Sequence, residues 1–164
     1  MLLASDVRNT QTAYGLWDGS QWAHVWRRST SAEDTEDQLA GWLKVMFDLA
    51  SLPFAADTIV CASVVPQLNR SLQDLARERF GRELLMIGPE DRFGLKIGFS
   101  PAASIGADRL ANCLGALDKW EPPIIVVDFG TATTFDAIDA SGAYIGGAIL
   151  PGIEVSTEAL VSRT

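Results

Sequence analysis

The fold is decided by two similar stretches of sequence, LLASDVRNTQTAYGL at residues 2–16 and IIVVDFGTATTFDAI at residues 124–138. They align at an offset of 122 residues, the difference between positions 6 and 128, which places Asp6 on Asp128. Each copy predicts a strand ending in Asp, a tight turn, a hydroxyl-rich strand, a second turn and a third strand. An internal repeat of this kind indicates a duplicated fold.

The segment between the two copies alternates between helical and strand patterns. We expect a helix capped by Thr30 or Ser31, a strand at 58–64, a helix from Pro66 to Gly81, a strand at 84–87, a loop at 88–100 and a helix at 101–117. The acidic residues Glu33, Asp34, Glu36 and Asp37 are expected to form a solvated helix start rather than a metal site.

The repeat also predicts the domain organisation. The first copy and its helices give a first domain at residues 1–118, and the second copy begins a second domain at 119–164. Only about 42 residues belong to the second copy, so a domain equal to the first would need roughly 80 more. The predicted fold class is α/β and duplicated, with the first domain complete and the second incomplete. Either the chain is naturally short, or the domain pair extends beyond the sequence given.

Composition and charge exclude several classes of protein. The 164 residues are 48% hydrophobic and 21% charged, which is typical of a globular protein. The net charge of −8 would repel nucleic-acid phosphates and anionic membrane surfaces. No apolar run approaches the roughly 20 residues of a membrane span, and the start of the chain lacks the basic residues of a signal peptide. With two cysteines that fit reduced thiols, we expect a cytoplasmic protein with no nucleic-acid and no membrane partner.

The two Asp-turn-Thr loops are the first candidate for chemistry. A carboxylate at the end of a buried strand can position Mg²⁺, while the amides and hydroxyls of a tight hairpin cradle phosphate. An Asp at a strand end can equally cap a turn, and that interpretation is the better one for a single copy. Because two copies occupy matched positions, we favour a metal-nucleotide site in a cleft between two domains.

A second candidate is the run Gly106-Ala107-Asp108-Arg109 near the start of a predicted helix. A charged pair there can be a surface ion pair of little energetic consequence. Alternatively, Asp108 is a general base and Arg109 holds an anionic group of a substrate. The spacing alone is compatible with both interpretations.

These motifs, in this order, resemble the type III pantothenate kinases. The resemblance rests on DVRNTQTAYGLWDG at 6–19, CASVVP at 61–66, IGADRLAN at 105–112, VVDFGTATTFDAI at 126–138 and GGAILPGI at 146–153. It runs along essentially the whole chain and covers roughly the first two-thirds of a typical family member. It implies a ribonuclease H-like (actin-like ATPase) fold of the acetate-and-sugar-kinase type. It also implies cytoplasmic, ATP-dependent phosphorylation of pantothenate, the first step of coenzyme A biosynthesis.

The resemblance implies a role for each matched position. The first ATP phosphate loop would comprise Asp6, Val7, Arg8, Asn9, Thr10, Gln11, Thr12 and Ala13, with Asp6 near Mg²⁺ and Thr131 as a further ATP contact. Asp128 would bind a monovalent cation, K⁺ or NH₄⁺. The pantothenate contacts would be Phe99, Gly106, Ala107, Asp108 and Arg109, with Asp108 as the proton acceptor. A homodimer is expected, since family members build part of the site at a dimer interface and uncovered apolar residues promote association, for example Ile145, Ile149, Leu150 and Ile153.

Two positions depart from the family pattern. Phe99 stands where the family often has a substrate-contacting Tyr, so a hydroxyl is lost there. Arg8 replaces the Gly of the D-x-G-N-T loop. The internal repeat also indicates glycine at this position, because Arg8 aligns with Gly130. Arg8 could fill nucleotide space or pair with Asp6, or it could bind phosphate through its own charge. We expect that Arg8 obstructs the binding of the nucleotide.

Two other functions are alternatives to a pantothenate kinase. A non-catalytic relative that acts as a binding or dimerising protein is favoured by Arg8 and by the short second copy. A sugar or acetate kinase with the same fold is disfavoured by the GADR and DFGTATTFD motifs.

Overall fold

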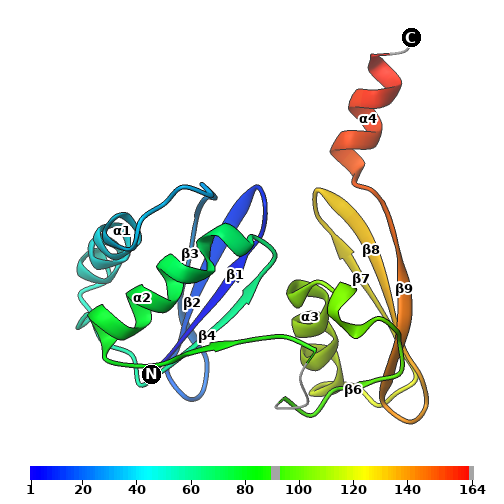
Figure 1. Ribbon diagram of the computed structural model, residues 1–164, viewed down its shortest axis with the longest axis horizontal. Coiled ribbons are helices and arrows are strands. Elements are labelled where there is room, and N and C mark those ends of the chain that lie inside the picture. The colour runs from blue at the N-terminus through cyan, green and yellow to red at the C-terminus, as the bar shows by residue number, and fades with distance from the viewer. Residues whose placement is uncertain (90–92, 163–164) are drawn as a thin grey trace. The chain divides into compact units, whose positions relative to one another are not determined.

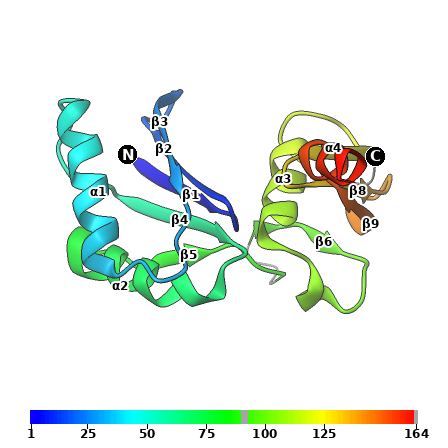
Figure 2. The ribbon, with the colours of Figure 1, turned by 90° about the horizontal axis from the view of Figure 1, so that it is seen from above.

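The computed structural model describes residues 1–89 and 93–162, and the chain divides into two compact units, Met1–Ile87 and Gly88–Thr164. Each unit is built on one β-sheet (Figures 1 and 2). The division comes earlier in the chain than the boundary after residue 118 expected from the repeat. The reason is that helix α3 (Ala107–Leu117) packs on strands of the second sheet.

Unit 1 contains a five-stranded sheet with the strand order β3-β2-β1-β4-β5. Its strands are β1 (Leu2–Val7), β2 (Gln11–Trp17), β3 (Trp22–Ser29), β4 (Thr58–Ser63) and β5 (Leu84–Met86). The first three strands form an antiparallel meander, as the sequence predicts. β4 pairs parallel to β1, and β5 pairs parallel to β4. Parallel pairing requires a crossover connection, and helices supply it here.

Those helices are α1 (Glu36–Leu49) and α2 (Asn69–Phe80), and both lie on one side of the sheet (Figures 1 and 2). They share one hydrophobic core with the sheet, because Leu43 and Leu75 belong to the same buried cluster as Leu3. Residues along β1 alternate between buried and partly exposed, so one face of the strand packs on the helices.

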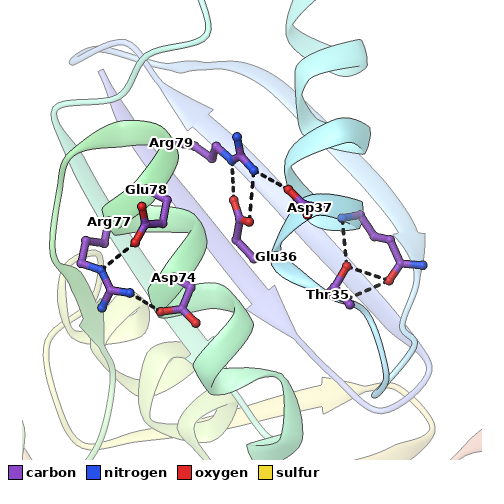
Figure 3. Close-up of polar contacts among 8 residues, drawn as sticks. Thr35, Glu36, Asp37, Asp74, Arg77, Glu78 and Arg79 are labelled. Atoms are coloured by element: carbon purple, nitrogen blue, oxygen red, sulfur yellow. Dashed lines mark hydrogen bonds and ion pairs between the residues drawn. The ribbon is translucent and has the colours of Figure 1, made fainter.

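α1 begins later than expected. Its N-cap is Thr35 rather than Thr30 or Ser31, and the Thr35 side chain accepts a hydrogen bond from the backbone N–H of Gln38. The Gln38 side chain in turn accepts a hydrogen bond from the backbone N–H of Thr35 at 2.8 Å, which completes a capping box (Figure 3). The reciprocal pair satisfies two donors at once, and a single hydroxyl at Thr30 or Ser31 would satisfy one.

The expectation that Asp34 belongs to a solvated helix start is wrong. Asp34 lies before the helix, is 9% exposed, and accepts a hydrogen bond from Arg28 Nη2 at 2.6 Å. Glu36 and Asp37 do occupy the first turn, and both pair with Arg79 of α2 (Figure 3). These ion pairs connect the two helices of unit 1 on their solvent side.

Unit 2 contains a four-stranded sheet with the strand order β6-β9-β8-β7. Its strands are β6 (Lys96–Ile97), β7 (Ile124–Phe129), β8 (Ala132–Ile138) and β9 (Ala143–Pro151). β6 falls within the segment expected to be a loop, of which residues 90–92 lie outside the described residues. The chain then enters α4 (Ile153–Val161). Within the described ranges, no helix combines the length and the apolar character that crossing a bilayer requires.

The strands confirm the internal repeat. β1 and β7 occupy residues 2–7 and 124–129, which is the predicted offset, and each is followed by two antiparallel strands. The hairpins differ by one residue, since Asp6 pairs with Ala13 whereas Asp128 pairs with Thr134. The second Asp loop is therefore the tighter of the two.

The two copies differ in which sheet face is covered. In unit 1, Leu3 and Val7 are each 1% exposed, because α1 and α2 pack over them. The matching side chains of unit 2, Ile125 and Phe129, are 63% and 69% exposed. The apolar residues expected to be uncovered are also exposed, namely Ile145, Ile149, Leu150 and Ile153.

A pair of leucines on α1 tests the assignment of the unit 1 core. Leu43 is fully buried and Leu49 is 76% exposed. Leu43→Ala should lower the free energy of unfolding by about 2–5 kcal/mol, because it leaves a cavity. Leu49→Ala should change it by less than about 0.5 kcal/mol. Urea unfolding followed by tryptophan fluorescence measures both, and equal losses would contradict this core.

Candidate functional site

The loop between β1 and β2 holds the predicted phosphate-binding segment, and its charged residues are already paired. Arg8 Nε donates a hydrogen bond to Asp6 Oδ2 at 2.8 Å. The side chains are 32% and 39% exposed, so solvent reaches both. The pairing that the sequence offered as one possibility for Arg8 is therefore present. It engages one oxygen of the carboxylate that was assigned to Mg²⁺.

The backbone of Arg8 is unstrained. Ser51 is the one non-glycine residue in the described part of the chain with a positive φ, so Arg8 does not need the conformational freedom of glycine. The loop closes with a hydrogen bond from the Arg8 N–H to the Gln11 carbonyl at 3.3 Å. What distinguishes this loop from one with glycine is therefore the guanidinium itself.

The other residues of the first loop differ in how accessible they are. Asn9, Thr10 and Gln11 are exposed at the tip, where they can reach a ligand. Thr12 is 3% exposed, and its hydroxyl lies 2.7 Å from that of Thr30 at the end of the neighbouring strand. Thr12 therefore anchors the loop to β3.

The second loop, between β7 and β8, is held by two contacts within unit 2. Asn112 Nδ2 of α3 donates to Asp128 Oδ2 at 3.0 Å. The Gly152 N–H donates to the Thr131 carbonyl at 3.0 Å. A Cβ at Gly152 would collide with the backbone of Gly130 and Thr131, so only glycine lets the start of α4 approach this closely.

The run 106–109 forms the start of α3. Gly106 is the N-cap and Asp108 lies in the first turn, where unpaired N–H groups favour a negative charge. Asp108 Oδ1 accepts a hydrogen bond from the Arg109 N–H at 2.9 Å. The carboxylate is partly exposed, so it can also accept a proton from a bound hydroxyl.

Arg109 is anchored by a residue 27 positions later in the chain. Its Nε atom donates a hydrogen bond to Asp136 Oδ1 at 2.8 Å, and its Nη2 atom forms an ion pair with the same oxygen at 2.6 Å. The side chains of Arg109 and Asp136 are 12% and 0% exposed. Burial acts to lower the pKa of Arg109, but the hydrogen bond and charge of Asp136 raise it above its ordinary value. Arg109 is therefore a fixed positive charge rather than a solvated surface residue.

Two aromatic residues extend this contact. The Tyr144 hydroxyl on β9 donates to Asp136 Oδ1 at 2.9 Å. Burial, together with this hydrogen bond, raises the pKa of Tyr144 to about 12, so the phenol stays protonated. Phe99 meets the Tyr144 ring edge-on, with centroids 6.3 Å apart.

The predicted substrate residues Phe99 and Arg109 are thus connected through Asp136 and Tyr144, neither of which was predicted as a site residue. The signal for Asp136 was its position on β8, two residues before the buried Ile138, where an acidic side chain must face the core.

Asn112 was also missed. It lies four residues after Asp108, which places the two side chains on one face of α3.

Comparison with known proteins identifies the family. The sequence model described as type III pantothenate kinase matches residues 2–164. A type III pantothenate kinase from Anaeromyxobacter sp. (strain K) is 43% identical over 161 residues, covering 98% of this chain and 63% of the relative. One from Syntrophotalea carbinolica is 40% identical, covering 99% and 64%. The chain thus spans just under two-thirds of the length of these curated relatives.

Solved structures support the fold. A candidate 2-dehydro-3-deoxygalactonokinase from Sinorhizobium meliloti aligns with a TM-score of 0.55 at 12% identity, covering 99% of this chain and 56% of that one. The ethanolamine utilization protein EutJ from Carboxydothermus hydrogenoformans aligns with a TM-score of 0.51 at 14% identity, covering 98% and 56%. The predicted α/β, actin-like fold class is confirmed. On the match to residues 2–164, the chain belongs to the type III pantothenate kinase family.

Proposed function

We propose that this chain carries out the ATP-dependent phosphorylation of pantothenate to 4′-phosphopantothenate, the first step of coenzyme A biosynthesis. The observation that carries the proposal is the family match over nearly the whole chain. The start of α3 supports it, because a partly exposed carboxylate at Asp108 lies next to the fixed positive charge of Arg109. A non-catalytic relative is the weaker alternative, since the matched relatives are named as kinases.

In this proposal each residue of the run 106–109 has a part in substrate binding or proton transfer. Asp108 accepts the proton of the pantothenate hydroxyl as that oxygen attacks the γ-phosphorus of ATP. The bond from the γ-phosphorus to the bridging oxygen breaks, and ADP leaves. Arg109 holds the anionic end of pantothenate, while Phe99, Gly106 and Ala107 contact the rest of it. Catalysis then rests on positioning and charge neutralisation.

The nucleotide and cation assignments follow the two loops. In unit 1, the segment 6–13 binds ATP phosphates, and Asp6 fits Mg²⁺, which proteins often hold with one or two carboxylates plus phosphate oxygens. In unit 2, Thr131 contacts ATP, and Asp128, whose carboxylate supplies oxygen ligands, fits K⁺ or NH₄⁺. Bound Mg²⁺ would neutralise phosphate charge. No group of three or more His, Cys, Asp or Glu side chains gathers as a metal site within residues 1–89 and 93–162.

We further propose a cytoplasmic homodimer that binds neither nucleic acid nor membrane. The two cysteines are buried free thiols, and burial raises the pKa of Cys61 to about 11 and that of Cys113 to about 12. Such thiols are compatible with a reducing compartment. The exposed apolar side chains of unit 2 supply surface for self-association.

Asp108 provides the direct test of the proposed activity. In a coupled assay with ATP, pantothenate and ammonium, Asp108→Asn should lower kcat by about 10²- to 10⁴-fold, because the proton acceptor is lost. The control is Asp118→Asn, an exposed aspartate at the other end of α3, which should leave turnover unchanged. Unchanged turnover in Asp108→Asn would refute the assignment.

Arg8 tests whether the first loop is obstructed. Arg8→Gly should raise the affinity for Mg²⁺-ATP about 3- to 10-fold, because a partly exposed ion pair worth about 1 kcal/mol no longer engages Asp6. Calorimetry measures the affinity of both forms, with Arg70→Ala on the exposed side of α2 as the control. Weaker binding in the glycine variant would show instead that Arg8 itself binds phosphate.

Self-association can be tested through the exposed apolar residues. Sedimentation at micromolar concentration should show a dimer, and Ile149→Lys should shift it toward monomer because a charge at an apolar contact is costly. Ile149 is 64% exposed. The matched control is Val45→Lys on α1, because Val45 is 52% exposed. A well-folded monomer of the unmodified chain at this concentration would contradict the proposal.

A further inference from the structure

We propose that Asp136 is a positioning residue of the pantothenate site, whose buried carboxylate fixes the guanidinium of Arg109 for contact with the substrate. The inference rests on the proposed function, which places Arg109 against pantothenate. All of the residues involved lie in unit 2.

The geometry around Asp136 is that of a fixed anchor. Three polar atoms converge on its Oδ1 atom. Arg109 Nε and the Tyr144 hydroxyl donate hydrogen bonds at 2.8 and 2.9 Å, and Arg109 Nη2 forms an ion pair at 2.6 Å. Asp136 is inaccessible to solvent, so water does not screen its attraction for the guanidinium. An arginine held by two of its nitrogens has little rotational freedom left.

The sheet beneath Arg109 is shaped to receive it. Gly147 on β9 is the ladder partner of Asp136 on β8. A Cβ at Gly147 would collide with Arg109 Nη2 and with the Phe135 carbonyl. Arg109 Nη2 also lies 3.4 Å from that carbonyl. The guanidinium therefore crosses the sheet at a position that only glycine leaves open.

This arrangement leaves one part of the guanidinium for a ligand. Nε and Nη2 of Arg109 contact Asp136, whereas Nη1 donates to no protein acceptor among the described residues. Nη1 is therefore the donor that can meet an anionic group. Because the other two nitrogens are held, its direction is set before the substrate arrives, which lowers the entropic cost of binding.

The arrangement is poorly suited to stability alone. Asp136 Oδ2 is buried and accepts no hydrogen bond within the described ranges. Desolvating a charged pair is costly, and the cost is recovered only when the remaining lone pairs are also satisfied. A pair kept for stability would use both oxygens, whereas here all three contacts converge on the one that holds Arg109.

The experiment compares the full chain with Asp136→Asn, which keeps the shape of the side chain and removes its charge. The KM for pantothenate should rise about tenfold or more, while the KM for ATP stays unchanged. In an Arg109→Ala background, Asp136→Asn should have no further effect on the pantothenate KM, because the residue it positions is gone. The matched control is Asp34→Asn, which breaks the buried Arg28–Asp34 pair of unit 1 and should leave the pantothenate KM unchanged.

A second readout does not depend on activity. In the unmodified chain, the Arg109 Nε–H proton should exchange slowly with solvent by NMR, and in Asp136→Asn it should exchange rapidly. If Asp136→Asn fails to fold, Tyr144→Phe removes one donor from the same oxygen and should raise the pantothenate KM about 2- to 3-fold. Tyr14→Phe, a buried tyrosine of unit 1, is its control.

The outcomes separate the inference from the proposed function. If Arg109→Ala weakens pantothenate binding and Asp136→Asn does not, the inference is overturned and the function stands. If calorimetry shows no pantothenate binding to the unmodified chain, the function fails and the inference falls with it. Slow exchange at Arg109 would then report a purely structural ion pair.

Discussion

Burial of one face of each sheet is the constraint on which the rest of the structure depends. Side chains alternate along a strand, so packing Leu3 and Val7 against helices turns Asp6 toward the opposite face, next to Arg8. In the second copy the other face of the strand is covered: Ile125 and Phe129 are exposed, and Asp128 faces α3, where it accepts a hydrogen bond from Asn112. In each copy, the surroundings of the acidic residue therefore follow from which face of its strand the helices cover.

Much of the fold could be predicted because the relevant signals are local and repeated. The two copies predict both three-stranded meanders, and β1 and β7 fall at the expected offset. The start of α1 was misplaced because several hydroxyl residues in the preceding segment can cap a helix. The choice of Thr35 depends on a reciprocal bond with Gln38. The compact units could not be predicted from the repeat, because α3 packs on strands that come later in the chain than the helix itself.

The residues of the candidate site likewise fall into those that the sequence could identify and those that it could not. Arg109 stands out through its motif and Phe99 through its place in the family resemblance, and the possible pairing of Arg8 with Asp6 follows from two residues close in sequence. Asp136 could not be connected with Arg109 from spacing, because the contact spans 27 residues and depends on how α3 lies across β8. Its buried position on β8 was the one available sign, since a carboxylate facing a core must have a partner.

The two arginine–aspartate pairs, one in each unit, differ in environment, and this difference governs what each can do. The Arg8–Asp6 pair is about one-third exposed, so solvent competes with it and a bound cation or phosphate can replace it at small cost. The Arg109–Asp136 pair is almost fully buried, so separating it would leave an uncompensated charge in the interior. A ligand can therefore replace one partner of the Arg8–Asp6 pair, whereas it must bind beside the intact Arg109–Asp136 pair. The first loop is suited to binding that rearranges side chains, and the start of α3 to recognition by a guanidinium already in place.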